Sequence, residues 1–232
     1  IGGSSLNNVP LLLKVDSRNL TVTDMSGVAN TIGSGDIYAL TGFGDQLFIG
    51  GYHQGAASSG PLLFILNLDN DQVIALSGYL PQSFGQVLSI SYNSGVLLVT
   101  GVYEDVLLNL TNHNYSLIAV PQGTLADLSS APFGDGFLTV GSSLRGGQLL
   151  YIGLNGTVKD LSSILENMTY EVITISRYGK DFFLGGWGID GSFAGLFNPY
   201  SLSLSRISMP SPYSLNGSEI LASAGNVGDL LI

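Results

Sequence analysis

A short hydrophobic run that closes on glycine recurs five times along this chain of 232 residues. The recurring position falls at residues 2, 50, 100, 140 and 185, which gives spacings of 48, 50, 40 and 45 residues. The five copies are Ile1–Gly3, Leu47–Gly51, Leu97–Gly101, Leu138–Gly141 and Phe183–Gly186. Repeats of this length can each form one small sheet, and five of them fill the chain. The spacing therefore predicts a β-propeller.

Each repeat contains the signals for four strands. In the copy from 84 to 120, the first strand is expected over 86–92, and the turn Asn93-Ser94-Gly95 leads into a second strand over 96–100. A third strand follows the glycine, as at 62–66, 149–152 and 194–197, and a turn rich in Asn and Asp precedes a fourth, as at 73–76. We therefore expect an all-β, five-bladed β-propeller with four-stranded antiparallel blades.

The two ends of the chain predict how the ring closes. The N-terminal part offers outer strands over 11–15 and 20–23, and the C-terminal part offers inner strands over 220–224 and 228–232. Pairing these in one blade would close the ring and remove exposed sheet edges. A section of a larger propeller is the alternative. Because the chain opens inside a repeat, we expect residues 1–232 to be a single domain excised from a longer protein.

The glycine pairs in Ile49-Gly50-Gly51 and Leu184-Gly185-Gly186 resemble the kelch repeat, in which such a run closes the second strand. The third strand of a kelch repeat likewise runs into a polar turn. Trp187 is the single tryptophan, and Thr100-Gly101 and Val140-Gly141 replace the glycine pair in two copies. The resemblance implies a propeller fold, and a total of five blades is nearer to five-bladed lectins and glycosidases. No functional residue is carried over from these families.

Composition limits the partners of this chain. With seven Lys and Arg residues and a net charge of −10, it lacks the basic patch that nucleic-acid binding requires. The absence of cysteine excludes disulfides and thiolate metal sites. The longest stretch without charge, 72–103, is interrupted by Pro81, Gln82, Gln86 and Asn93, so we expect no membrane span.

Low charge and N-glycosylation motifs indicate the cell exterior. Charged residues make up 10 % of the chain, and six Asn-x-Ser/Thr motifs exceed the number that chance would produce. These lie at Asn19, Asn109, Asn114, Asn155, Asn167 and Asn216. A surface poor in ionisable groups also suits an acidic medium, in which carboxylates lose their charge. The composition resembles that of cell-surface proteins of thermoacidophilic archaea.

The longest loops predict a binding face. Loops that join strands two and three, and loops that join one blade to the next, emerge on the same face of a propeller, and function concentrates in such loops. Tyr and Trp beside amide and acid side chains suit a sugar, although these aromatics can also simply cover the core. The candidate residues are Tyr52, His53, Gln54, Tyr103, Trp187, Asp190 and Tyr213.

A polar column lies fourteen residues before each glycine position. It contains Asp36, Gln86, Ala126 with Asp127 beside it, Glu171 and, counted back from an expected further copy at 233, Glu219. These residues begin the innermost strands, so we expect them around the mouth of the central channel. Converging oxygens there could bind calcium, and crowded carboxylates raise one another's pKa. Alternatively, each side chain caps the backbone of its own loop.

These features favour a non-catalytic extracellular module that binds a glycan or a protein. A glycoside hydrolase using Asp36, Glu171 and Glu219 is the alternative, and a structural spacer is a third. His53 and His113 are expected on opposite faces, so neither a Ser-His-Asp triad nor a shared metal is supported. We assign no catalytic residue and expect no cofactor, with calcium as the open possibility.

Overall fold

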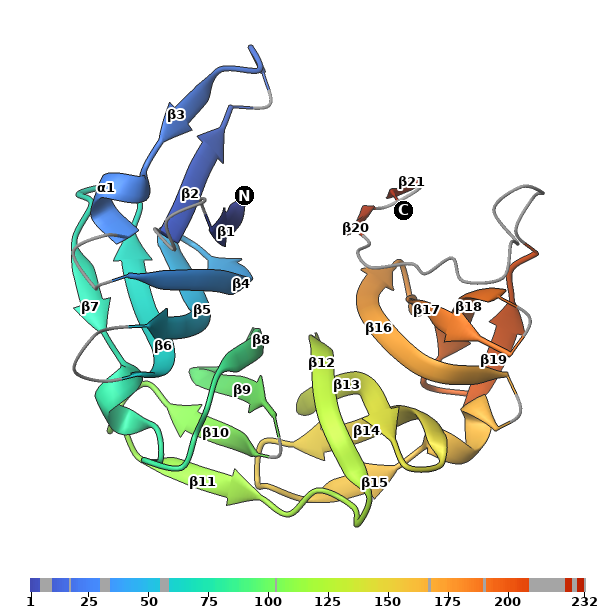
Figure 1. The fold of residues 1–232 in the computed structure, drawn as a ribbon. Helices are drawn as coiled ribbons and strands as arrows, with labels where there is room; N and C mark the ends of the chain where they lie inside the picture. Colours follow the sequence, from blue (N-terminus) through green and yellow to red (C-terminus); the bar gives the residue numbers. More distant parts are fainter. Residues whose placement is uncertain are drawn as a thin grey trace. The chain divides into compact units, whose positions relative to one another are not determined.

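The computed structural model describes residues 1–4, 10–16, 18–29, 34–54, 59–102, 104–166, 168–189, 191–208, 224–226 and 229–231. Strands dominate, and the described helices are the single turn α1 (Ser26–Ala29) and the short 3-10 helices η2 (Ser77–Tyr79) and η3 (Ser162–Leu165) (Figure 1). None of these helices has the length and apolar character needed to cross a membrane. The chain divides into two compact units: unit 1 comprises 1–102 and 108–116, and unit 2 comprises 103–107 and 117–232.

Four sheets of four strands make up most of the fold. The first contains β4 (Gly35–Phe43), β5 (Gln46–Gln54), β6 (Ser59–Asn67) and β7 (Val73–Ala75), and the second contains β8 (Val87–Asn93), β9 (Val96–Gly101), β10 (Asp105–Asn109) and β11 (Tyr115–Ile118). The third contains β12 (Thr124–Phe133), β13 (Gly136–Ser143), β14 (Gly146–Gly153) and β15 (Val158–Asp160), and the fourth contains β16 (Thr169–Tyr178), β17 (Asp181–Gly188), β18 (Gly191–Asn198) and β19 (Ser203–Arg206). Consecutive strands pair antiparallel, which confirms the all-β architecture of four-stranded blades.

Two smaller sheets contain the terminal strands. β1 (Gly2–Ser4), β2 (Pro10–Val15) and β3 (Val22–Asp24) form one, and β20 (Ala224–Asn226) pairs with β21 (Asp229–Leu231) in the other. The outer strands predicted over 11–15 and 20–23 correspond to β2 and β3. Most of the strand predicted over 220–224 lies outside the described residues. Among the described residues, β1–β3 and β20–β21 pair only within their own sheets, so ring closure through a shared blade stays a prediction.

The recurring glycine has a packing reason. The first strand of each four-stranded sheet carries a β-bulge near its start. Just before that bulge, a backbone carbonyl approaches the second strand so closely that a β-carbon would collide with its oxygen. The colliding pairs are Gly51 with Asp36, Gly141 with Ala126, and Gly186 with Glu171. The sequence repeat therefore marks the point where a bulged inner strand meets its neighbour.

Apolar side chains of successive sheets form the core of each unit. In unit 1 the core cluster includes Leu12, Ile37, Ile49, Leu62, Phe64 and Leu66. In unit 2, side chains of β12, β13 and β14 pack against those of β16, β17 and β18. Because the blade faces in these clusters are covered by apolar neighbours, polar groups on such a face require an explanation.

Candidate functional site

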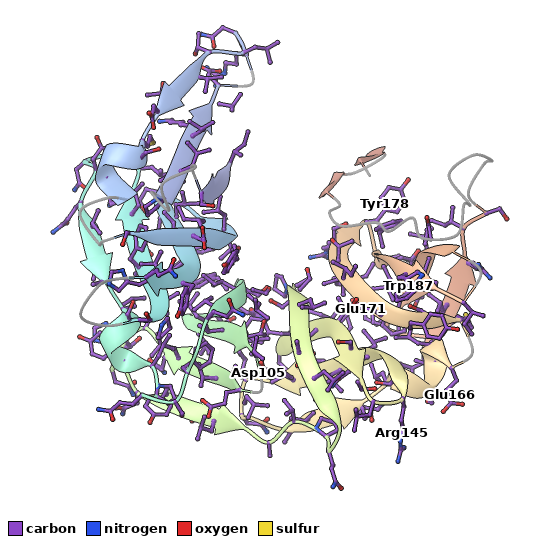
Figure 2. The ribbon with its side chains drawn as sticks, in the orientation of Figure 1. Asp105, Arg145, Glu166, Glu171, Tyr178 and Trp187 are labelled. Carbon is purple, nitrogen blue, oxygen red and sulfur yellow. The ribbon has the colours of Figure 1, made fainter. Side chains whose placement is uncertain are left out.

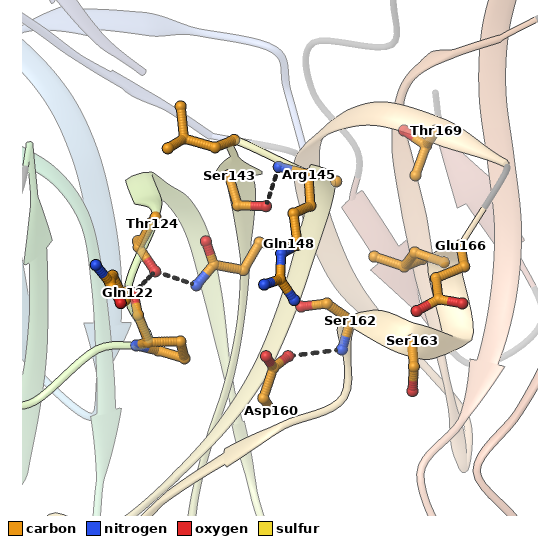
Figure 3. A pocket seen from close by; sticks show the side chains of 15 residues that line it. Gln122, Thr124, Ser143, Arg145, Gln148, Asp160, Ser162, Ser163, Glu166 and Thr169 are labelled. Carbon is orange, nitrogen blue, oxygen red and sulfur yellow. Dashed lines mark hydrogen bonds between the residues drawn. The ribbon is translucent and has the colours of Figure 1, made fainter.

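A polar pocket of about 700 Å³ opens at one end of the third sheet, within unit 2 (Figure 3). Three segments form it: 121–124 before β12, the turn 143–147 between β13 and β14, and residues between 160 and 169, which lead from β15 into β16. These are connections between strands two and three and between successive blades, the two kinds on which function is expected.

Gln148 is a buried polar side chain that lines the pocket. It is 2 % exposed, and its Nε2 donates a hydrogen bond to Thr124 Oγ1 at 2.8 Å (Figure 3). Its Oε1 has no hydrogen-bond partner among the described residues. A buried acceptor without a donor is costly, so a ligand that donates a hydrogen bond there would recover free energy.

The rim of the pocket is polar and includes both signs of charge. Arg145, Asp160 and Glu166 are exposed. The Arg145 backbone N donates to Ser143 Oγ at 3.2 Å, and the Ser162 backbone N donates to Asp160 Oδ1 at 2.9 Å (Figure 3). These bonds hold the two turns that carry the charged groups. A hydroxyl-rich ligand would find both donors and acceptors along such a rim.

An exposed aromatic pair is connected to the pocket through Thr169. The rings of Tyr170 and Trp187 have centroids 5.2 Å apart and are tilted by 51°. Tyr170 is 49 % exposed and Trp187, labelled in Figure 2, is 40 % exposed. Thr169 lines the pocket, and its Oγ1 donates a hydrogen bond to the Trp187 carbonyl oxygen at 2.6 Å. The backbone of Trp187, a residue singled out from the sequence, is thus hydrogen-bonded to a residue of the pocket wall.

The other predicted ligand residues lie elsewhere. Tyr52, His53 and Gln54 end strand β5 in unit 1. His53 Nδ1 lies 2.8 Å from the Ser34 carbonyl oxygen, which also accepts a hydrogen bond from the Gln54 backbone N at 2.9 Å. These contacts fasten the strand to the preceding loop. Tyr103, Asp190 and Tyr213 lie outside the described residues.

The polar column occupies the starts of the inner strands, but its members differ in environment. Asp36, Gln86 and Glu171 are half-buried. Asp36 Oδ2 accepts a hydrogen bond from the Tyr38 hydroxyl at 3.2 Å, and burial, followed by the Asp36 charge, raises the pKa of Tyr38. Asp127 is 1 % exposed, so its carboxyl faces the interior of unit 2 rather than solvent. Glu219 lies outside the described residues.

Several predicted glycosylation asparagines have a turn-forming role. Asn109 Oδ1 accepts hydrogen bonds from the backbone N of Thr111 and Asn112. Asn67 and Asn198 form the same turns without belonging to a glycosylation motif. Part of the motif excess therefore has a structural origin.

The other motif asparagines divide between turns and undescribed positions. The Oδ1 atoms of Asn19 and Asn155 accept hydrogen bonds from Thr21 and Thr157, respectively. Asn114 is exposed before β11. Asn167 and Asn216 lie outside the described residues.

One face of the third sheet is polar where two other sheets are apolar. In β12–β14 the strand register aligns Asp127, Gly141 and Gln148 across the sheet. The corresponding rows are Ile37, Gly51 and Leu62 in the first sheet, and Val172, Gly186 and Phe193 in the fourth. Thr139 likewise lies two residues before its glycine, as Ile49 and Leu184 do. Asp127 lies one residue after the column position Ala126, so the fourteen-residue spacing does not by itself reveal this polar row.

Comparison with known proteins identifies the fold. One similar structure is a chain of the crystal structure of a nidogen/laminin complex, with a TM-score of 0.67 over 99 % of this chain and 82 % of that chain. The fold is that of a β-propeller. At 8 % sequence identity, the likeness of this propeller extends to the fold alone. No protein-family model and no curated protein sequence matches the chain.

Proposed function

We propose that this propeller is a non-catalytic binding module and that the pocket of unit 2 holds a glycan. The proposal rests on Gln148, because its buried Oε1 has no hydrogen-bond donor among the described residues and it lines a pocket with a polar rim. A sugar hydroxyl can supply that donor. The exposed faces of Tyr170 and Trp187 suit the CH groups of a neighbouring sugar ring.

The proposal includes a position at the cell exterior. Low charge, the glycosylation motifs and the compositional resemblance to archaeal surface proteins support it. Asn19, Asn114 and Asn155 are exposed in turns, where a glycan can be attached without disturbing the core. The kelch-like repeats would then serve as the rigid scaffold for the binding loops.

Gln148→Leu is the sharpest test, because Leu62 occupies the corresponding position in the first sheet. We expect this variant to fold and to bind a glycan selected on an array about five- to tenfold more weakly, since one hydrogen bond contributes about 1–1.5 kcal/mol. Arg145→Ala and Trp187→Ala should also weaken binding. Arg18→Ala, an exposed change in unit 1, is the matched control and should leave the calorimetric Kd unchanged.

Two outcomes would contradict this function. Unchanged affinity in Gln148→Leu, with wild-type melting, would remove the pocket from the binding site. Release of reducing ends from the bound glycan would instead favour a glycoside hydrolase. The carboxylates at this pocket are Asp160 and Glu166, not the set Asp36, Glu171 and Glu219 that the sequence suggested. If no glycan on the array binds and no protein partner is found, the spacer interpretation gains support.

A protein ligand is the second candidate, because the similar propeller comes from a nidogen/laminin complex. A protein surface would contact the exposed rim, where Trp187 and Arg145 are residue types that often dominate interfaces. The two candidates are distinguishable. A protein interaction should weaken in Trp187→Ala but not in Gln148→Leu, whereas glycan binding should weaken in both.

A further inference from the structure

We propose that Asp105 and Asp127 share one proton in the folded protein, which makes the fold most stable in acid and less stable as the medium approaches neutral pH. Asp105 begins strand β10 and Asp127 lies on strand β12, and both are buried within unit 2. This inference is independent of the proposed glycan pocket.

The two carboxyl groups are buried and in contact. Asp105, labelled in Figure 2, is 2 % exposed, and Asp127 is 1 % exposed. Asp105 lies within hydrogen-bonding reach of the Asp127 carboxyl group, and so does Thr139. An ionised carboxylate can only accept hydrogen bonds, so a bond between two carboxyl groups requires a proton on one of them.

The charged residues named below supply no positive charge that would neutralise a second carboxylate in place of this proton. β13 carries no ionisable residue, and β16 contributes Tyr170, Glu171, Arg177 and Tyr178. Arg177 is exposed, and its Nε donates to the Gly179 carbonyl oxygen at 3.1 Å, beyond the C-terminal end of that strand. Glu171 and Glu104, the neighbour of Asp105, would add further negative charge.

Burial is accordingly the largest influence on Asp127, and it raises the pKa of this carboxyl, whereas the hydrogen bonds to Asp105 and Thr139 lower it. The net direction is upward. Because two adjacent carboxylates in a dry interior repel each other, the proton on the pair persists above the pH at which an exposed Asp ionises.

A calcium ion fits this site less well than a proton does. Calcium takes about six to eight oxygen ligands, whereas the described residues contain no cluster of three or more acidic, histidine or cysteine side chains. The calcium suggested by the polar column is therefore not assigned to Asp127.

The raised pKa sets the sign of the pH dependence. Below the ordinary Asp pKa of 3.8, the pair holds its proton in both the folded and unfolded states, and the stabilisation is complete. As the pH rises above this value, the unfolded chain releases the proton while the folded chain keeps it. The unfolding equilibrium constant should then rise about tenfold per pH unit until the pH passes the folded pKa.

The test is urea unfolding of the full chain from about pH 3 to about pH 8. In the double variant Asp105→Leu/Asp127→Val, each Asp is replaced by the residue type found at the corresponding position of another sheet. Leu149 of the third sheet corresponds to Asp105, and Val172 of the fourth sheet corresponds to Asp127. We expect wild-type stability to fall above about pH 4, whereas the double variant should lose this component. Asp69→Asn, which removes an exposed carboxylate, is the control and should keep the wild-type profile.

A second measurement keeps the proposal testable if the double variant fails to fold. Carbon NMR of the wild-type carboxyl groups should show a titration of the pair well above the ordinary Asp pKa. Titration of both groups near the ordinary value would overturn the proposal, as would an unchanged pH profile in a folded double variant. Stabilisation by calcium at neutral pH that disappears in the double variant would show that the pair holds a cation instead.

Discussion

Leu184→Asp is expected to prevent folding. Leu184 is completely buried and belongs to the core cluster in which β17 packs with side chains of the third sheet, such as Leu138 and Leu149. An isolated carboxylate there would cost several kcal/mol, which is comparable to the roughly 5–15 kcal/mol that stabilises a typical domain. The variant should lack near-ultraviolet circular dichroism and a cooperative thermal transition. Ile90→Asp in unit 1 should behave in the same way.

The matched control is Leu117→Asp on strand β11, where the side chain is 59 % exposed. It should melt within a few degrees of the wild type, because an exposed charge needs no desolvation. Leu184→Ala should fold but lose about 2–5 kcal/mol through the cavity it creates. A soluble Leu184→Asp protein that melts cooperatively near the wild-type temperature would contradict the buried placement.

Gly51→Ala should destabilise the protein by about 3 kcal/mol, through steric overlap rather than loss of an interaction. A β-carbon at this position would collide with the carbonyl oxygen of Asp36, which belongs to the backbone and cannot rotate away. The bulge between Ile37 and Ala39 would have to shift. For a chain of this size, we expect the thermal midpoint to fall by about 10 °C.

Gly60→Ala provides the control within the same sheet, since a β-carbon there has no other atom within 4 Å. Its thermal midpoint should stay close to that of the wild type, because replacing glycine by alanine in open space changes stability only slightly. Equal melting of Gly51→Ala and Gly60→Ala would show that the carbonyl oxygen does not approach Gly51 as described.

The blade architecture follows from sequence because its signals are local. Strands predicted over 86–92 and 96–100 correspond to β8 and β9, and the intervening turn places Ser94 and Gly95 at positive φ. Turn chemistry and hydrophobic periodicity act over a few residues, so they can be read without knowing which blades meet. The need for glycine at the end of the second strand depends on a carbonyl oxygen of the bulged first strand, and only the three-dimensional structure shows how closely that oxygen approaches.

The pocket was harder to predict. The longest loops of the chain do not contain Gln148 and Arg145, which come from a short turn and the strand that follows it. Trp187 was selected for its aromatic character, and the contact that connects it to the pocket is made by Thr169, which carried no sequence signal. Proximity between 121–124, 143–147 and 160–169 depends on how the connections fold over the sheet.

Sequence alone determined the repeat, the strand order and the all-β class, since each depends on spacing and side-chain pattern within one repeat. Tertiary structure decided which polar residues became buried partners. Asp105 and Asp127 belong to different repeats, and only strand register and blade packing bring their carboxyl groups into contact. The physical reason is that burial and proton sharing are properties of a three-dimensional environment, which a linear pattern does not encode directly.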